Sequence, residues 1–393
     1  MIYSALFFTF FMGVGAYLAN LSPYVLTTYP RQANWIFICT QLASPVGAIL
    51  AGYTTDKTKL LRGPLLVSLF GFGIFQLILF AGLPASWTIL AATLMKLCMS
   101  ASGQLITIAC LEDGNDRFAR SRTAGTIGFC AVQVILYFIS ISSQTASIQT
   151  GIVAQWGSIF YLIAFILAFK IPIYRKARET YYFRETFVYL LRPRFLAFFA
   201  MSFVFYACYQ LVDFYIGRFI QITHGIKYVY LGWGLSVVLE ICLMPFTASL
   251  FDRYHTRFLF VLSIVAGGIR FLFLALSSEF TALPPHYAQI LHGLHFTGYY
   301  AAAIFLLKGS LPDRLYGTAF ALYSAFASSL GGVAGSMVTA SALQINPTAS
   351  GYATVFYVTS AVHVLLIPAF LLMKLPDSLQ EESRESASSY AVK

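Results

Sequence analysis

The sequence predicts an all-α integral membrane protein with twelve transmembrane helices in two pseudo-symmetric bundles of six. Three observations lead to this class: the composition, the spacing of apolar segments and a repeat of charged turns. Of 393 residues, 59% are hydrophobic and only 10% are charged, and the mean hydropathy is positive. Soluble globular domains are about 25% charged. The composition therefore excludes an ordinary soluble domain.

Apolar segments long enough to cross a bilayer, roughly 20 residues each, can be placed twelve times along the chain. They run near residues 4–26, 33–53, 64–82, 87–110, 123–142, 151–170, 195–216, 228–250, 258–276, 285–307, 318–341 and 352–374. The start of the sequence has no basic leader and no small-residue cleavage site. We therefore expect the first segment to be a retained span rather than a signal peptide.

Lysine and arginine concentrate in alternate loops between these segments. The loops on one side and the C-terminal tail hold most of them, whereas the other loops hold only Arg31, Arg218 and Lys227. By the positive-inside rule, the basic side is cytoplasmic. We expect a multi-pass protein of the cell (inner, cytoplasmic) membrane with both termini in the cytoplasm. The net charge of +10 follows from this topology and indicates no nucleic-acid partner.

Two short charged turns repeat at half the length of the chain. Asp56-Lys57 follows the second segment, and Asp252-Arg253 follows the eighth, 196 positions later. Such repeats are typical of transporters built from related halves. We expect an N-terminal bundle over 1–170, a cytoplasmic linker over 171–194, a C-terminal bundle over 195–374 and a disordered cytoplasmic tail over 375–393. The basic linker is predicted to rest on anionic lipid headgroups.

The stretch Gln289–Ala303 sets titratable side chains in an apolar run. His292, His295 and Tyr299 recur at spacings of three and four, with Tyr300 one step on. These spacings place them on one side of a helix. We expect that side to face water. Ionisable groups at membrane depth are costly and mark transport paths or sites. A polar cavity lined partly by this helix is therefore predicted.

Glu240 and Arg270 are expected near the bilayer midplane in the eighth and ninth segments. We favour a proton-binding carboxylate whose protonation depends on burial and on Arg270. A permanent ion pair is the alternative, but apolar packing replaces such a pair at little loss. His292 and His295 are candidates for proton relay or for donation to a substrate, with satisfied structural histidines as the alternative. A metal site is disfavoured, because neither has a nearby cysteine or paired carboxylate in sequence.

Lys96 lies in the fourth segment, at the position that the half-chain offset maps onto the histidine stretch. Its charge requires a partner across the cavity or in the substrate, which favours a carboxylate or several hydroxyls over a cation. A lysine neutral by desolvation, or paired with Asp213 or Glu240, is an equally open alternative. The expected substrate-binding residues are Lys96, Gln104, Tyr17, Asn20, Tyr206, Tyr209, His292, His295, Tyr299 and Tyr300.

The turn Gly52-x3-Asp56-Lys57 resembles the loop between helices two and three of the major facilitator superfamily. The segments LGWGLSVVLE, SIVAGGIRF and AQILHGLHFTGYYAAA resemble helices of its phenylpropionate permease-like branch. That branch is similar to lactose permease and to the nucleoside:proton symporters. The segment Phe118–Phe129 is similar to the branch's loop entering helix five, with Arg122 at the position of its arginine.

This resemblance implies the major facilitator fold over nearly the whole chain. The expected gating-loop residues are Asp56, Lys57, Arg122, Asp252 and Arg253. Tyr300 stands where the branch commonly has a second histidine, and His295 stands where it tends to have a small or hydroxyl residue. These departures leave the substrate open more than the fold.

The leading hypothesis is a secondary active transporter: proton-coupled symport of a small polar or anionic organic solute by alternating access. Proton-coupled antiport that exports drugs or metabolites is the alternative, although the interior acids lie in the C-terminal half. A membrane enzyme or receptor is disfavoured, because the sequence shows no nucleophile elbow, metal signature or phosphate-binding glycine loop. The expected partners are the solute, protons and the lipid bilayer. The proton gradient takes the place of a cofactor, and we expect a monomer.

Overall fold

The computed structural model describes residues 1–111, 115–142, 150–174, 183–246, 256–280, 283–311, 315, 319–320 and 322–373. Within these residues the chain is helical, apart from its connections and one isolated antiparallel bridge between Leu60 and Tyr174. Twelve helical segments among them are long and apolar enough to cross a membrane. The prediction of an all-α protein with twelve spans is confirmed.

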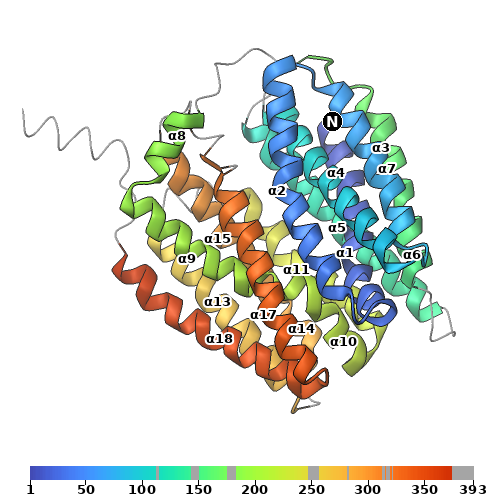
Figure 1. Cartoon of the computed structure of the whole chain (residues 1–393), viewed down its shortest axis with the longest axis vertical. Helices are drawn as coiled ribbons and strands as arrows, with labels where there is room; N and C mark the ends of the chain where they lie inside the picture. The colour runs from blue at the N-terminus through green and yellow to red at the C-terminus, as the bar shows by residue number, and fades with distance from the viewer. Residues whose placement is uncertain are drawn as a thin grey trace, which may run out of the picture.

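The first group of helices runs through residue 168 (Figure 1). It comprises α1 (Ile2–Thr28), α2 (Ala33–Thr58), α3 (Arg62–Leu79), α4 (Ala85–Leu111), α5 (Asn115–Ser142), α6 (Thr150–Trp156) and α7 (Ser158–Ala168). The short helix α8 (Phe183–Leu190) follows, within the segment expected to link the bundles. The predicted tail, 375–393, lies outside the described residues.

The second group contains the remaining helices. It comprises α9 (Pro193–Tyr209), the π-helical turn η1 (Val212–Ile216), α10 (Gly217–His224), α11 (Ile226–Leu243), the 3-10 turn η2 (Met244–Phe246), α13 (Thr256–Leu276), α14 (Pro285–Ala288), α15 (Ile290–Ser310), the π-helical turn η3 (Ser324–Leu330), α17 (Gly331–Ile345) and α18 (Ala349–Leu372).

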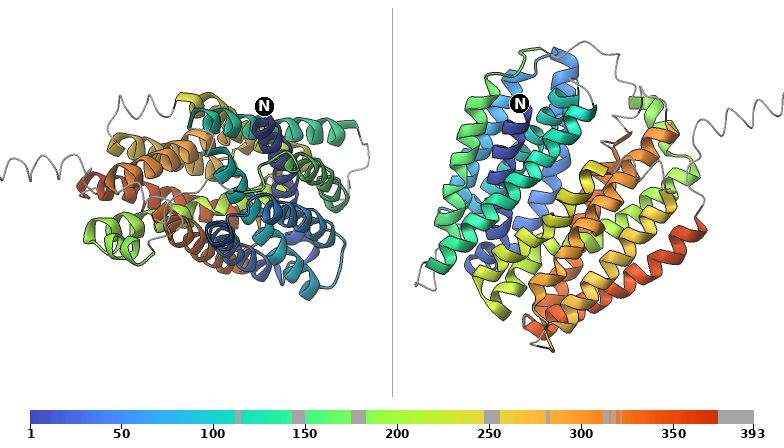
Figure 2. Two further views of the ribbon diagram at one scale, coloured as in Figure 1. Left: turned by 90° about the horizontal axis from the view of Figure 1, so that it is seen from above. Right: turned by 180° about the vertical axis from the view of Figure 1, so that it is seen from behind.

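The two groups lie side by side and approach each other most closely at the end where α10 lies (Figures 1 and 2). Hydrogen bonds between side chains join them there: Tyr230 Oη to Asn20 Oδ1 at 2.9 Å, Gln41 Nε2 to Gln210 Oε1 at 2.8 Å, and Tyr215 Oη to Asn34 Oδ1 at 3.3 Å. Toward the opposite end, where α8 lies, the ribbons of the two groups diverge (Figure 2). By the positive-inside argument, the hydrogen-bonded end is the one predicted to face outward.

Two helices extend well past their predicted bounds. Helix α5 begins at Asn115, whereas the sequence predicted a span starting near residue 123. The cause is that no proline or glycine interrupts the polar segment before the apolar run, so the helix continues through it. The seventh span extends over Pro193–His224, well past the predicted end at residue 216. It includes η1, a π-helical turn of the kind that recurs at functional sites.

Small residues allow two pairs of helices to pack closely. A Cβ atom added at Gly47 of α2 would lie 2.2 Å from the backbone oxygen of Leu97 in α4. One added at Gly335 of α17 would lie 1.9 Å from the backbone oxygen of Ala207 in α9. Neither position has room for a side chain. The close approach of helices at such residues is a general feature of membrane proteins.

Gly335→Val should therefore destabilise the folded chain by about 1–3 kcal/mol, the usual range for overpacking a filled interior. The valine side chain would meet backbone atoms of α9, which move only if the helices separate. Thermal unfolding of the purified protein in detergent measures the effect. Gly309→Val is the matched control, because a Cβ at Gly309 of α15 would meet nothing within 4 Å. Equal unfolding temperatures for the two variants would contradict this packing.

Candidate functional site

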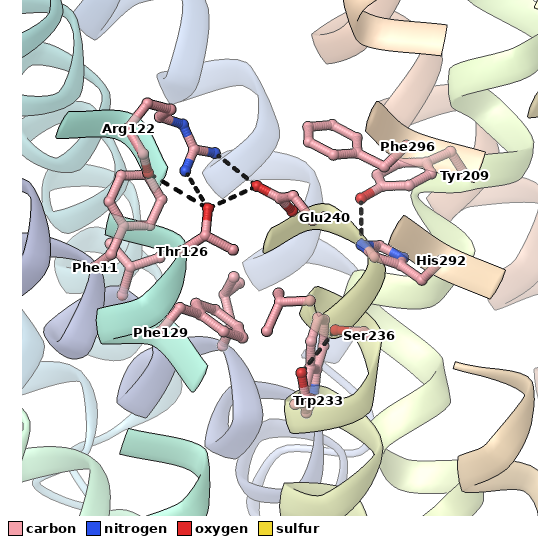
Figure 3. Close-up of a pocket in the computed structure, with 13 residues that line it drawn as sticks. Phe11, Arg122, Thr126, Phe129, Tyr209, Trp233, Ser236, Glu240, His292 and Phe296 are labelled. Atoms are coloured by element: carbon pink, nitrogen blue, oxygen red, sulfur yellow. Dashed lines mark hydrogen bonds and ion pairs between the residues drawn. The ribbon is translucent and has the colours of Figure 1, made fainter. Parts of the chain in front are cut away.

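A cavity of about 120 Å³ lies between the two groups of helices (Figure 3). Its walls come from α1 and α5 on one side and from α9, α11 and α15 on the other. The lining residues are Phe11, Val14, Leu18, Arg122, Thr126, Phe129, Tyr209, Trp233, Ser236, Val237, Glu240, His292 and Phe296. A volume of this size exceeds the roughly 10–15 Å³ that one water needs on the same scale. The cavity therefore has room for several waters or for part of a small solute.

One wall of the cavity holds an ion pair that joins the two groups. Arg122 Nη2 of α5 lies 3.4 Å from Glu240 Oε1 of α11. The Glu240 side chain is 5% exposed, and that of Arg122 is 19% exposed. Since buried charge pairs are costly to desolvate, they require further hydrogen bonds to be stable. The neighbouring hydroxyl supplies these.

Thr126 lies one turn after Arg122 on α5 and bonds to both members of the pair (Figure 3). Its hydroxyl donates to Glu240 Oε1 at 2.9 Å and accepts from Arg122 Nη1 at 3.0 Å. An ionised carboxylate only accepts and a guanidinium only donates, so the direction of both bonds is fixed. The ring of Phe11 packs 4.3 Å from the guanidinium carbon, a cation–π contact. The charged cluster is thus oriented by residues from α1, α5 and α11.

The rest of the lining is largely aromatic and includes one imidazole. Tyr209 Oη of α9 lies 3.2 Å from His292 Nε2 of α15. Phe129 and Trp233 meet edge to face at a centroid separation of 6.1 Å, one from each group of helices. A cavity with several aromatic faces and a few convergent polar groups has the usual character of a small-molecule site.

The sequence placed Arg270 near Glu240 by depth alone, but the cation found beside this carboxylate is a different one. Among the described residues, Glu240 pairs with Arg122 and accepts from Thr126. The Arg270 guanidinium is fully buried in α13 and donates to the side-chain oxygen of Gln289, immediately before α15. Depth along a span can be counted from the sequence, but the direction in which a side chain points from its helix depends on packing. Similar depth therefore did not imply contact.

The location predicted for Arg122 also needs correction. The sequence assigned it to a loop entering the fifth span, but it lies within α5 and faces the cavity. Lys57, another predicted gating residue, is exposed near the end of α2, with its ammonium 5.6 Å from the Tyr53 ring centroid. Asp252, Arg253 and the Asp56 side chain lie outside the described residues.

The prediction that one side of the histidine helix, with all its titratable residues, faces a polar cavity is only partly right. His292 lines the cavity, but His295 and Tyr299 are fully buried away from it. Tyr299 bonds to Ser202 Oγ of α9 at 2.8 Å and stacks on Phe205 at a centroid separation of 3.5 Å. Seven residues of helix span about 10 Å. The face that begins at the cavity therefore continues into the interior of the second group.

The remaining predicted substrate-binding residues lie elsewhere. Lys96 and Gln104 of α4 and Tyr17 of α1 are not among the side chains that line the cavity. Asn20 is fully buried and accepts from Tyr230 between the two groups. Tyr206 lies at the buried contact of α9 with Tyr299 and Tyr323, and Tyr300 stacks on Phe296 at 5.4 Å. Of the ten residues, Tyr209 and His292 line the cavity.

Several cavity residues were not predicted from the sequence. The main ones are Phe11, Thr126, Phe129, Trp233 and Phe296. Thr126 had a signal, since it follows Arg122 at a spacing of four, which places both on one face of a helix. The aromatic residues had none, because phenylalanine and tryptophan are common throughout these apolar spans.

Comparison with known proteins agrees with the described fold. The chain is similar to a crystal structure of a mutant form of the nucleoside transporter NupG, at 16% identity and a TM-score of 0.82, covering 95% of this chain and 98% of that one. It is also similar to a D-xylose-proton symporter, at 13% identity and a TM-score of 0.73, covering 95% and 96%. A search of curated protein sequences finds no significant match.

These solved structures are transporters rather than enzymes, and at such low identity they show the fold. The family model described as MFS_1 like family matches residues 1–354, which is most of the chain. Together with the twelve membrane-spanning helices, the match accounts for a multi-pass membrane protein with the major facilitator transporter fold. The chain belongs to the MFS_1 like family.

Proposed function

We propose that the chain is a proton-coupled symporter that takes up a small organic solute by alternating access, with the proton on Glu240. The observation that supports this most is the Arg122–Glu240 ion pair, which links the two groups of helices at the wall of a cavity. Protonation of the carboxyl group would remove its charge and with it the ionic bond between α5 and α11. Binding of a proton would thus change both the cavity and the contact between the groups.

Coupling to the solute follows from competition for Arg122. While Glu240 is ionised, its carboxylate occupies the guanidinium. Once Glu240 is protonated, Arg122 becomes available to an oxygen of the solute, for which its fork of donors is well suited. Proton and solute would then bind together and cross together. This account assigns the cationic role to Arg122, in place of Lys96 as the sequence suggested.

The cavity favours a solute that has both a ring and polar oxygens. Phe129, Trp233 and Phe296 offer apolar faces, while Arg122 and His292 offer hydrogen-bonding groups on opposite walls. A nucleoside, a pentose and an aromatic carboxylate each meet this description. The structural neighbours transport a nucleoside and D-xylose, which supports testing these two first. We propose that no cofactor takes part and that the proton gradient supplies the energy.

The direction of proton movement tests the proposal. Purified protein in vesicles should alkalinise a weakly buffered outer medium when a nucleoside, D-xylose or phenylpropionate is added outside, because protons enter with the solute. A protonophore should abolish accumulation of the labelled compound. Acidification of the outer medium would instead identify the antiport alternative, and solute movement without any pH change would contradict proton coupling.

A further inference from the structure

Two imidazoles form a buried pair in the second group of helices, apart from the cavity. His295 Nε2 of α15 lies 3.1 Å from His363 Nε2 of α18. Both side chains are 0% exposed, and neither lines the cavity. His363 had no signal in the sequence, because a single histidine in an apolar helix does not reveal its partner.

The hydrogen bonds fix which nitrogens hold protons when both rings are neutral. His363 Nδ1 lies 2.8 Å from the backbone oxygen of Thr359, and that oxygen can only accept. His363 Nδ1 is therefore protonated, and its Nε2 is the acceptor. It follows that His295 Nε2 donates to His363. His295 Nδ1 is left as a bare lone pair, buried and with no hydrogen-bond partner among the described residues.

The helix α13 is shaped to accommodate the pair. A Cβ atom added at Gly267 would lie 2.5 Å from His295 Nε2 and 2.7 Å from His363 Cδ2. The adjacent residue, Gly268, accepts a hydrogen bond from Ser360 Oγ of α18 at 2.9 Å, which holds α18 against α13. Three helices thus converge on the contact between the imidazoles. Burying four ring nitrogens is costly, and apolar side chains of similar size would fill the space without that cost.

The titratable and charged groups around the pair come from three helices. Tyr209 of α9 has its ring centroid 5.5 Å from that of His295, and its hydroxyl bonds to His292, three residues earlier on α15. Arg270 follows Gly267 by three residues on α13, and its side chain is fully buried. A cation on the pair would be repelled by this guanidinium. The hydrogen bonds at the pair are those of two neutral rings, and an added proton would have to be accommodated against this guanidinium.

We propose that His295 and His363 form a second proton-binding site, distinct from Glu240, which takes up its proton on His295 Nδ1. The proton comes from a hydronium ion of the medium, whose O–H bond breaks as the N–H bond on His295 forms, leaving water. The positive charge is shared through the Nε2–H···Nε2 hydrogen bond with His363, whose Nδ1–H remains bonded to the Thr359 carbonyl. This proposal goes beyond the proposed function, since proton binding by the folded chain does not require that any solute be transported.

Nitrogen-15 NMR of the histidine-labelled full chain in lipid nanodiscs tests the proposal without any solute. At high pH we expect one imidazole protonated at Nδ1 and one protonated at Nε2, joined by a hydrogen bond. On acidification the bare Nδ1 of the second ring should become protonated, and the Nε2 signal of the first ring should shift with the same midpoint. A His295 Nδ1 that stays unprotonated at every pH at which the chain remains folded would overturn the proposal.

Three variants sharpen this titration. In His363→Gln the midpoint of His295 should fall, because the acceptor that shares the charge is lost; an unchanged midpoint would overturn the pairing. In Glu240→Gln the midpoint should stay as in the parent, because the two sites are distinct, and its disappearance would contradict a separate site. His224→Gln, outside the pair, should leave the two signals unchanged. The native chain remains a complete test if a variant does not fold.

Discussion

Arg122→Ala should sharply lower solute transport, both the accumulation driven by a proton gradient and the exchange of labelled for unlabelled solute. Without the guanidinium, ionised Glu240 would be a buried charge without its cation. Breaking a buried ion pair in this way lowers the free energy of unfolding by about 3–5 kcal/mol. The solute would also lose a charge-assisted hydrogen bond, which contributes about 1.5–3 kcal/mol. Counterflow in vesicles measures the effect, and an affinity loss of about tenfold to a hundredfold is expected.

Arg120→Ala is the matched control, because Arg120 lies on the same helix two residues earlier and is exposed. It should transport as the parent does. Arg122→Lys keeps the charge but not the planar fork of donors, so we expect partial activity. Normal exchange by Arg122→Ala would contradict the assignment of this residue to solute binding.

Glu240→Gln should lose all accumulation against a gradient while it continues to exchange solute. Glutamine accepts the hydrogen bond from Thr126 but is neutral at every pH, so it resembles the protonated carboxyl permanently. The carrier would then move between its two orientations without a proton to couple. Accumulation under an imposed pH gradient and counterflow, measured on the same vesicles, separate the two activities.

Glu279→Gln is the control for this result. Glu279 is an exposed carboxylate that accepts a hydrogen bond from Tyr357 at 3.1 Å, and it should be dispensable for coupling. If Glu240→Gln still concentrates solute, the proton-coupling assignment is wrong. If instead both variants lose accumulation and exchange equally, a general defect of the protein would explain the loss better than a coupling defect.

The sequence was sufficient for the twelve spans because each segment must be apolar over the thickness of a bilayer, whatever its neighbours are. The extents of two helices were not predictable in the same way. Helix α5 begins eight residues before the apolar run, because the start of a helix depends on where the backbone is interrupted rather than on hydropathy. The π-helical turn η1 has no signature in residue type, since it reflects one extra residue within a helical turn.

The candidate site was predicted in part. Glu240 and His292 were identified because polar residues in apolar spans are rare, and both line the cavity. Arg122 was not predicted as the partner of Glu240, because contacts between helices depend on how each helix is rotated about its axis. That rotation follows from the packing of many weak apolar contacts, which a single sequence does not specify. His363 was missed for the same reason, although it contacts His295.

The account rests on the exchange of one partner for another at Arg122, and solute affinity as a function of pH is the measurement that tests it most directly. For the solute that the vesicle assay identifies, the dissociation constant of the parent protein should rise as pH increases, because ionised Glu240 reclaims Arg122. In Glu240→Gln it should be independent of pH and equal to the parent's value in acid. An identical rise with pH in both proteins would show that Glu240 does not govern binding and would contradict the account.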